Sequence, residues 1–202
     1  MASKYDAVLF DFDGVLVDSE PVHYECWREI LNGHGLTLDW DVYREQGIGV
    51  SDRAFLQFLC NQSDPPFEVE RLVAEYSRKK EMFLERMLAN PRITSEVRQL
   101  LSTLAADYKL AVVSSSGRTE VEPLLETAGI RHLFGAAVFG GDVQRKKPAP
   151  DPYLLALERL NVTRALVVED SDAGETSARA AGLDVLRVPK PEDMVRLVSD
   201  ML

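Results

Sequence analysis

The chain has 202 residues, of which 46% are hydrophobic, so it is long enough to bury a core in one domain with an insertion or in two small domains. A net charge of −10 argues against a duplex-binding surface, which would be basic. The two cysteines form no disulfide framework, no apolar stretch approaches the roughly 18 residues of a transmembrane helix, and the N-terminus lacks a signal region. We therefore expect a cytoplasmic protein without nucleic-acid or membrane partners, and we expect it to be a monomer.

Five short apolar runs predict buried strands. They are Ala7–Phe10, Leu110–Ser114, Ala136–Phe139, Ala165–Val168 and Val185–Val188. Except between the first two strands, a helix-length amphipathic segment separates each strand from the next. This rhythm predicts an α/β fold, a Rossmann-like parallel sheet with helices on both faces.

The segment between the first two strands is too long for one crossover helix and is helical in pattern throughout. Its predicted helices are Pro21–Leu31, Asp39–Glu45, Asp52–Leu59 and a long Phe67–Leu88, before Ser95–Ala106 returns to the sheet. We expect residues 18–88 to form a helical cap domain, inserted into a core domain of residues 1–17 and 89–202. A domain joined at two points can act as a lid.

Polar side chains follow the predicted strands where each one ends. Asp11 and Asp13 follow the first, Ser114 closes the second, and Asp170 follows the fourth. Ligands gather at the carboxyl ends of parallel strands, so we expect these groups to meet there. Carboxylate oxygens suit Mg²⁺, while Ser114 and Lys147 can bind a phosphate. One acid can attack phosphorus while the other moves the proton.

Four motifs in this order resemble the haloacid dehalogenase superfamily, in the phosphatase and phosphomutase branch that includes β-phosphoglucomutase. Asp11–Ser19 matches D-x-D-G-[VT]-[LI]-x-D-[ST], and Ser114 matches the serine that closes the second strand. Lys147–Pro150 matches K-P-x-P, and Glu169–Gly174 matches E-D-S-x-x-G. The resemblance covers essentially the whole chain and implies the same core with an inserted cap.

The resemblance also implies roles for individual residues. Asp11 resembles the nucleophile and Asp13 the general acid/base, which also gives a backbone carbonyl to Mg²⁺. Asp170 resembles a second metal ligand, with Glu169 at or near the metal. Ser114 and Lys147 resemble the groups that hold the transferred phosphoryl. Further substrate or phosphate contacts are expected from Ser115, Ser116, Arg118, His23, Glu20 and Arg53.

The mutase branch holds a second phosphate with an arginine in a loop that resembles Gly-Val-Ser-Arg. Here the loop continues from Gly49 through Val50 and Ser51 to Asp52, so an acid occupies the arginine position. This departure favours a hydrolase of monophosphates. We expect Mg²⁺-dependent hydrolysis of a small phosphoester, such as a sugar phosphate, through an aspartyl-phosphate on Asp11.

Other functions are less compatible with the sequence. A calcium loop of the EF-hand type fails because Gly14 comes too early and Val15 occupies a ligand position. A receiver-type signalling domain is shorter and lacks the helical insertion. A β-phosphoglucomutase-type sugar phosphomutase remains an alternative. A phosphate- and metal-binding regulatory protein without turnover remains a second one.

Overall fold

The structure is a computed structural model that describes residues 4–48 and 50–202. It divides into two compact units, one that runs to Asp18 and resumes at Pro91, and one of Ser19–Asn90. The expected domain boundaries lie one residue from the first of these crossings and two residues from the second. No helix among the described residues is long and apolar enough to cross a membrane.

The first unit contains a five-stranded parallel sheet in the order β3-β2-β1-β4-β5. Its strands are β1 (Ala7–Phe10), β2 (Lys109–Val113), β3 (Ala136–Val138), β4 (Ala165–Glu169) and β5 (Asp184–Arg187). The predicted α/β parallel sheet is therefore confirmed, with strand ends within one residue of those expected. Since Leu9 pairs with both Ala111 and Val167, the carboxyl ends of β2, β1 and β4 lie side by side.

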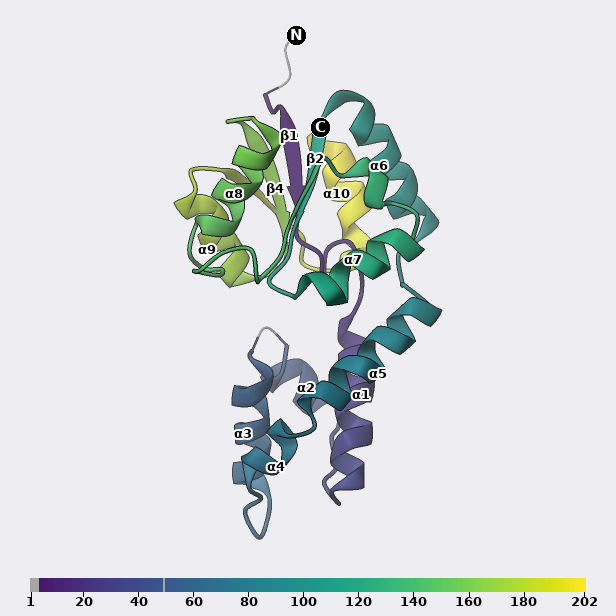
Figure 1. Cartoon of the computed structure of the whole chain (residues 1–202), viewed down its shortest axis with the longest axis vertical. Helices are drawn as coiled ribbons and strands as arrows, with labels where there is room; N and C mark the ends of the chain where they lie inside the picture. Colours follow the sequence, from purple (N-terminus) through teal and green to yellow (C-terminus); the bar gives the residue numbers. More distant parts are fainter. Residues whose placement is uncertain (1–3, 49) are drawn as a thin grey trace. The chain divides into compact units, whose positions relative to one another are not determined.

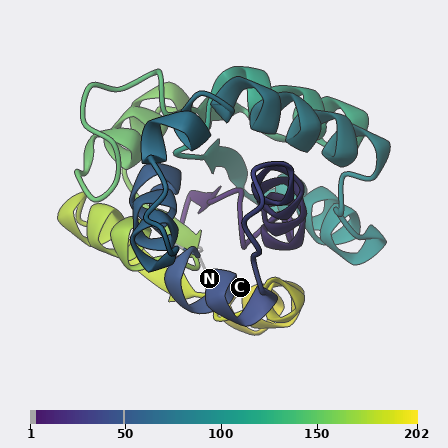
Figure 2. The same cartoon turned by 90° about the horizontal axis from the view of Figure 1, so that it is seen from below.

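Helices cover both faces of this sheet. On one face lie α8 (Asp151–Leu160) and α9 (Asp172–Ala180), and on the other lie α6 (Ser95–Asp107), α7 (Arg118–Thr127) and α10 (Met194–Met201) (Figure 1). The turned view in Figure 2 again separates α8 from the yellow α10. Two 3₁₀ turns, Arg131–Leu133 and Pro191–Asp193, complete the unit. The central strands β1 and β4 are buried along their whole length, which explains why β1 and the first four residues of β4 form continuous apolar runs.

The second unit is helical. Its helices are α1 (Glu20–Gly33), α2 (Trp40–Gln46), α3 (Asp52–Gln62), α4 (Val69–Val73) and α5 (Tyr76–Ala89). In Figure 1, α1 lies alongside α5, and α3 packs on α4. Trp27, Leu56 and Leu72 are fully buried in a core that draws all its residues from this unit.

The predicted long helix Phe67–Leu88 is wrong, because the structure divides it into α4 and α5. The α-helical hydrogen-bond pattern is interrupted at Glu75. Its N–H donates to the carbonyl of Leu72, three residues earlier, as in a 3₁₀ turn, and not to the carbonyl four residues earlier. No glycine or proline marks this point. The apolar spacing from Leu72 to Met87 therefore looks continuous in sequence.

Candidate active site

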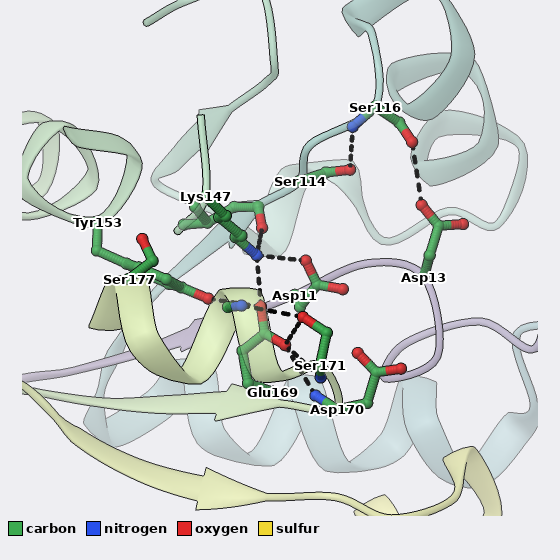
Figure 3. A network of polar contacts seen from close by, with 12 residues as sticks. Asp11, Asp13, Ser114, Ser116, Lys147, Tyr153, Glu169, Asp170, Ser171 and Ser177 are labelled. Atoms are coloured by element: carbon green, nitrogen blue, oxygen red, sulfur yellow. Dashed lines mark hydrogen bonds and ion pairs between the residues drawn. The ribbon is translucent and has the colours of Figure 1, made fainter. Parts of the chain in front are cut away.

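Lys147 lies at the centre of a buried polar network at the carboxyl edge of the sheet (Figure 3). Its Nζ donates to Asp11 Oδ1 at 2.6 Å, to Glu169 Oε1 at 2.6 Å and to the Val113 carbonyl at 2.9 Å. The side chain of Lys147 is only 4% exposed. All three N–H groups of the ammonium therefore have acceptors. Burial lowers the pKa of Lys147, but Asp11 and the other neighbours outweigh it, so the pKa lies well above its usual value.

Glu169, the last residue of β4, accepts hydrogen bonds on both carboxylate oxygens. Oε1 accepts from Tyr153 at 3.0 Å as well as from Lys147. Oε2 accepts from the backbone N–H groups of Asp170 and Ser171 and from the Ser171 hydroxyl. Burial raises the pKa of Glu169, but Lys147 and these donors outweigh it and hold the pKa below its usual value. Glu169 thus anchors both the lysine and the turn that carries Asp170.

Two glycines give these carboxylates room. A Cβ at position 174 would overlap the Glu169 carboxylate, and a Cβ at position 14 would overlap that of Asp170. Gly14 also has a φ of +76°, a conformation that L side chains rarely adopt. The glycines of the first and fourth motifs are therefore required by close approach.

Three acids crowd the network. Asp11, Glu169 and Asp170 each offer an oxygen, and these oxygens lie within 4.8 Å of one another. Burial, assisted by the charges of Glu169 and Asp170, raises the pKa of Asp11 well above its usual value despite the opposing Lys147. Burial and then Glu169 raise the pKa of Asp170 to about 7. Oxygen ligands and unrelieved like charge suit a hard divalent cation.

The serines after β2 form a second group of hydrogen bonds, which reaches Asp13. Ser114 is buried, and its Oγ accepts from the Ser116 N–H at 3.0 Å. The Ser116 hydroxyl donates to Asp13 Oδ2 at 3.1 Å. Ser116 therefore contacts the proposed acid/base. Ser115 is exposed.

Arg118 is engaged with other partners. Its guanidinium donates to Glu122 at 3.1 Å and to Asp142 at 3.2 Å, and it lies over the Phe139 ring. These contacts hold it at the start of α7, and within the described part of the chain it makes no hydrogen bond to the Lys147 network.

The remaining expected site residues belong to the second unit. Glu20 accepts from the Tyr43 hydroxyl at 2.7 Å, and Arg53 pairs with Glu70 at the surface. His23 stacks on Phe83, with ring centroids 4.0 Å apart. Gly49, in the loop before Asp52, lies outside the described residues.

The second unit also holds a partly buried polar cluster of Lys79, His23 and Asp52. The Lys79 Nζ lies 2.8 Å from His23 Nδ1 and 3.3 Å from Asp52 Oδ2. Trp27 Nε1 donates to the other Asp52 oxygen at 2.9 Å. Burial and then Lys79 lower the pKa of His23 to about 3. A neutral His23 accepts from Lys79 on Nδ1, so its proton lies on Nε2.

Sequence reasoning missed Tyr153 and Lys79. Both occur in amphipathic helices, where a tyrosine reads as core and a lysine as solvent-exposed. No local signal distinguishes them.

Comparison with known proteins is consistent with this arrangement. The family described as haloacid dehalogenase-like hydrolase matches residues 8–188. The phosphorylated carbohydrates phosphatase of Thermotoga maritima is 33% identical over 89% of this chain and 82% of its own length. The fructose-1-phosphate phosphatase YqaB of Escherichia coli is also 33% identical, over 93% of this chain and 98% of its own.

A solved structure agrees with these relatives. The structure of CbbY from Rhodobacter sphaeroides in complex with phosphate superposes with a TM-score of 0.70 and 28% identity, covering 90% of this chain and 84% of that one. The family match spans nearly the whole chain and includes all four motifs, which confirms the resemblance seen in the sequence. The chain belongs to the haloacid dehalogenase-like hydrolase family.

Proposed function

We propose that this hydrolase is a Mg²⁺-dependent phosphatase that cleaves a small phosphorylated metabolite through an aspartyl-phosphate on Asp11. The observation that carries the proposal is the buried contact of Asp11 with Lys147, beside Asp170 and at the carboxyl edge of the sheet. Relatives named as phosphatases of phosphorylated carbohydrates and of fructose 1-phosphate support a sugar phosphate as substrate.

The chemistry divides between the two acids of the first motif. An Asp11 carboxylate oxygen attacks phosphorus, and the ester P–O bond breaks while Asp13 gives its proton to the leaving oxygen. Asp13 then takes a proton from water, which attacks the phosphorus and releases Asp11 as a carboxylate. Ser114 and Lys147 hold the phosphoryl oxygens. We propose Ser19–Asn90 as the cap that selects the substrate.

The residues present fit Mg²⁺. Asp11 and Asp170, with the backbone carbonyl of Asp13, would hold the ion. Glu169 lies beside these ligands, but five hydrogen bonds already engage its oxygens, so it serves better as their anchor. The bound ion would neutralise like charge and let an anionic nucleophile approach a phosphoryl group.

Hydrolysis of p-nitrophenyl phosphate tests the proposal. We expect turnover with Mg²⁺, none with EDTA, and a fall to background in Asp11→Asn. Asp172→Asn is the matched control, because the Asp172 side chain lies only two residues beyond Asp170 but is 99% exposed. No turnover on a panel of phosphorylated metabolites, with Mg²⁺ still bound, would instead identify a regulatory protein.

The contacts of Asp52 favour a phosphatase over a mutase. Asp52 accepts hydrogen bonds from Trp27 and Lys79. Burial raises the pKa of Asp52, but Lys79 and the Trp27 donor outweigh burial and hold the pKa below its usual value, so Asp52 remains an anion. An anion that is already engaged by Lys79 and Trp27 cannot replace the arginine that holds a second phosphate in the mutase branch. With β-glucose 1-phosphate primed by glucose 1,6-bisphosphate, we expect release of inorganic phosphate. Formation of glucose 6-phosphate would support the mutase.

A further inference from the structure

Tyr153 and Lys147 share one acceptor, Glu169 Oε1. The Tyr153 hydroxyl donates to it at 3.0 Å and the Lys147 Nζ at 2.6 Å. Lys147 Nζ also lies 5.0 Å from the centroid of the Tyr153 ring. Tyr153 reaches this point from α8 and is completely buried, as is Glu169 (Figure 3). One side chain therefore contacts both members of the ion pair.

This sharing matters because the Lys147 ammonium has no N–H to spare. Its three acceptors are Asp11, Glu169 and the Val113 carbonyl. To bind a phosphoryl oxygen, Lys147 must loosen one of these contacts. A buried carboxylate oxygen left without a donor is strongly unfavourable. Glu169 Oε1 escapes that state when Lys147 moves, because Tyr153 still donates to it.

We propose that Tyr153 is a positioning residue that acts through Glu169, allowing Lys147 to shift its hydrogen bond from Glu169 to the phosphoryl group. This inference rests on the proposed phosphatase function. Burial and the neighbouring acids hold the pKa of Tyr153 well above its usual value, so the hydroxyl remains a donor. Without the hydroxyl, Lys147 is the only side-chain donor to Glu169 Oε1 among the described residues and is bound there more tightly.

The test is Tyr153→Phe, which keeps the ring and removes the hydroxyl. Inorganic phosphate is the probe, and its dissociation constant is measured by calorimetry with Mg²⁺ present. We expect this constant to rise about tenfold, and kcat/KM for p-nitrophenyl phosphate to fall by a similar factor, from the loss of one hydrogen bond to a buried charge. An unchanged phosphate affinity in Tyr153→Phe overturns the proposal.

Tyr5→Phe is the matched control. The Tyr5 hydroxyl donates to Asp184 at 2.9 Å in the same unit, so this variant also loses a tyrosine–carboxylate bond. We expect it to bind phosphate and turn over like the wild type. Urea unfolding of both variants measures stability. A purely structural role for Tyr153 would lower stability without a change in phosphate affinity.

A double-mutant cycle shows whether Tyr153 acts through Glu169. In a Glu169→Gln background, whose fold is checked by circular dichroism, Tyr153→Phe should change phosphate affinity by less than about twofold. An undiminished tenfold effect there refutes the route through Glu169. If the wild type neither binds phosphate nor hydrolyses any phosphoester, the proposed function fails. If the wild type does both and Tyr153→Phe matches it, only the role of Tyr153 fails.

Discussion

A half-buried neutral histidine makes stability depend on pH at the scale of one residue. Burial and Lys79 lower the pKa of His23 from 6.5 to about 3, and the weaker opposing effect of Asp52 does not restore it. The unfolded chain therefore binds a proton that the folded chain rejects. The stability from neutral His23 is present above pH 6.5 and is lost as the pH falls from 6.5 towards 3.

We predict that His23→Gln removes this dependence, since Gln can still accept from Lys79. Between about pH 7.5 and pH 5, the wild type should lose about 2 kcal/mol of unfolding free energy relative to the variant. Urea titrations followed by tryptophan fluorescence measure the difference, because the two tryptophans, Trp27 and Trp40, lie in the second unit. Parallel pH curves for the two proteins would contradict the prediction.

Individual site residues can be predicted from sequence where a strand fixes their position. Asp11, Ser114 and Asp170 follow β1, β2 and β4 directly, so the order of the strands alone places them at one edge. Tyr153 and Lys79 were not predictable in this way. Which face a helix buries, and what its side chains meet there, depends on packing between elements distant in sequence.

At the scale of single elements, the N-cap of α9 links helix stability to the site. The Ser171 Oγ accepts from the Gly174 N–H and donates to Glu169, both at 3.0 Å. Thr94 caps α6 in a comparable way by accepting from Val97, and within the described residues it makes no hydrogen bond to the Lys147 network. The two caps therefore form a matched pair in the first unit.

We predict that Ser171→Ala and Thr94→Ala each lower the free energy of unfolding by about 1 kcal/mol through loss of the cap. Ser171→Ala should also lower kcat/KM several-fold, because Glu169 loses a donor, whereas Thr94→Ala should leave kcat/KM unchanged. Urea unfolding and steady-state kinetics measure the two effects. Equal kcat/KM values for the two variants would show that the α9 cap does not contribute to catalysis.

Elements were predictable to the extent that their residues are uniformly buried or clearly punctuated. The short apolar runs of the strands differ clearly from the amphipathic pattern of the helices that flank them. The start of α1 is marked by Ser19-Glu20-Pro21, a typical helix N-terminal sequence. The break between α4 and α5 was not predictable, because it consists of one tightened turn without a breaking residue.

At the scale of the whole molecule, two hydrophobic cores each lie within a single unit. The core around Leu72 draws on the second unit alone, while the core that includes Leu160 draws on β-strands, α8 and α9 of the first. The chain passes between the units twice, after Asp18 and after Asn90. A cavity in one core therefore removes packing from that unit and leaves the other core intact.

We predict that Leu72→Ala lowers the unfolding free energy of the second unit by about 2–5 kcal/mol, as expected for a fully buried leucine. Its effect should be largest on tryptophan fluorescence, which reports this unit alone. Leu160→Ala, the matched variant in the first core, should instead act mainly on amide protection in the sheet, which belongs to the first unit alone. Since each of these two cores draws its residues from one unit, tryptophan fluorescence and amide protection should give different urea midpoints in each variant. Coincident midpoints, displaced equally by both substitutions, would show that the units unfold as one cooperative body.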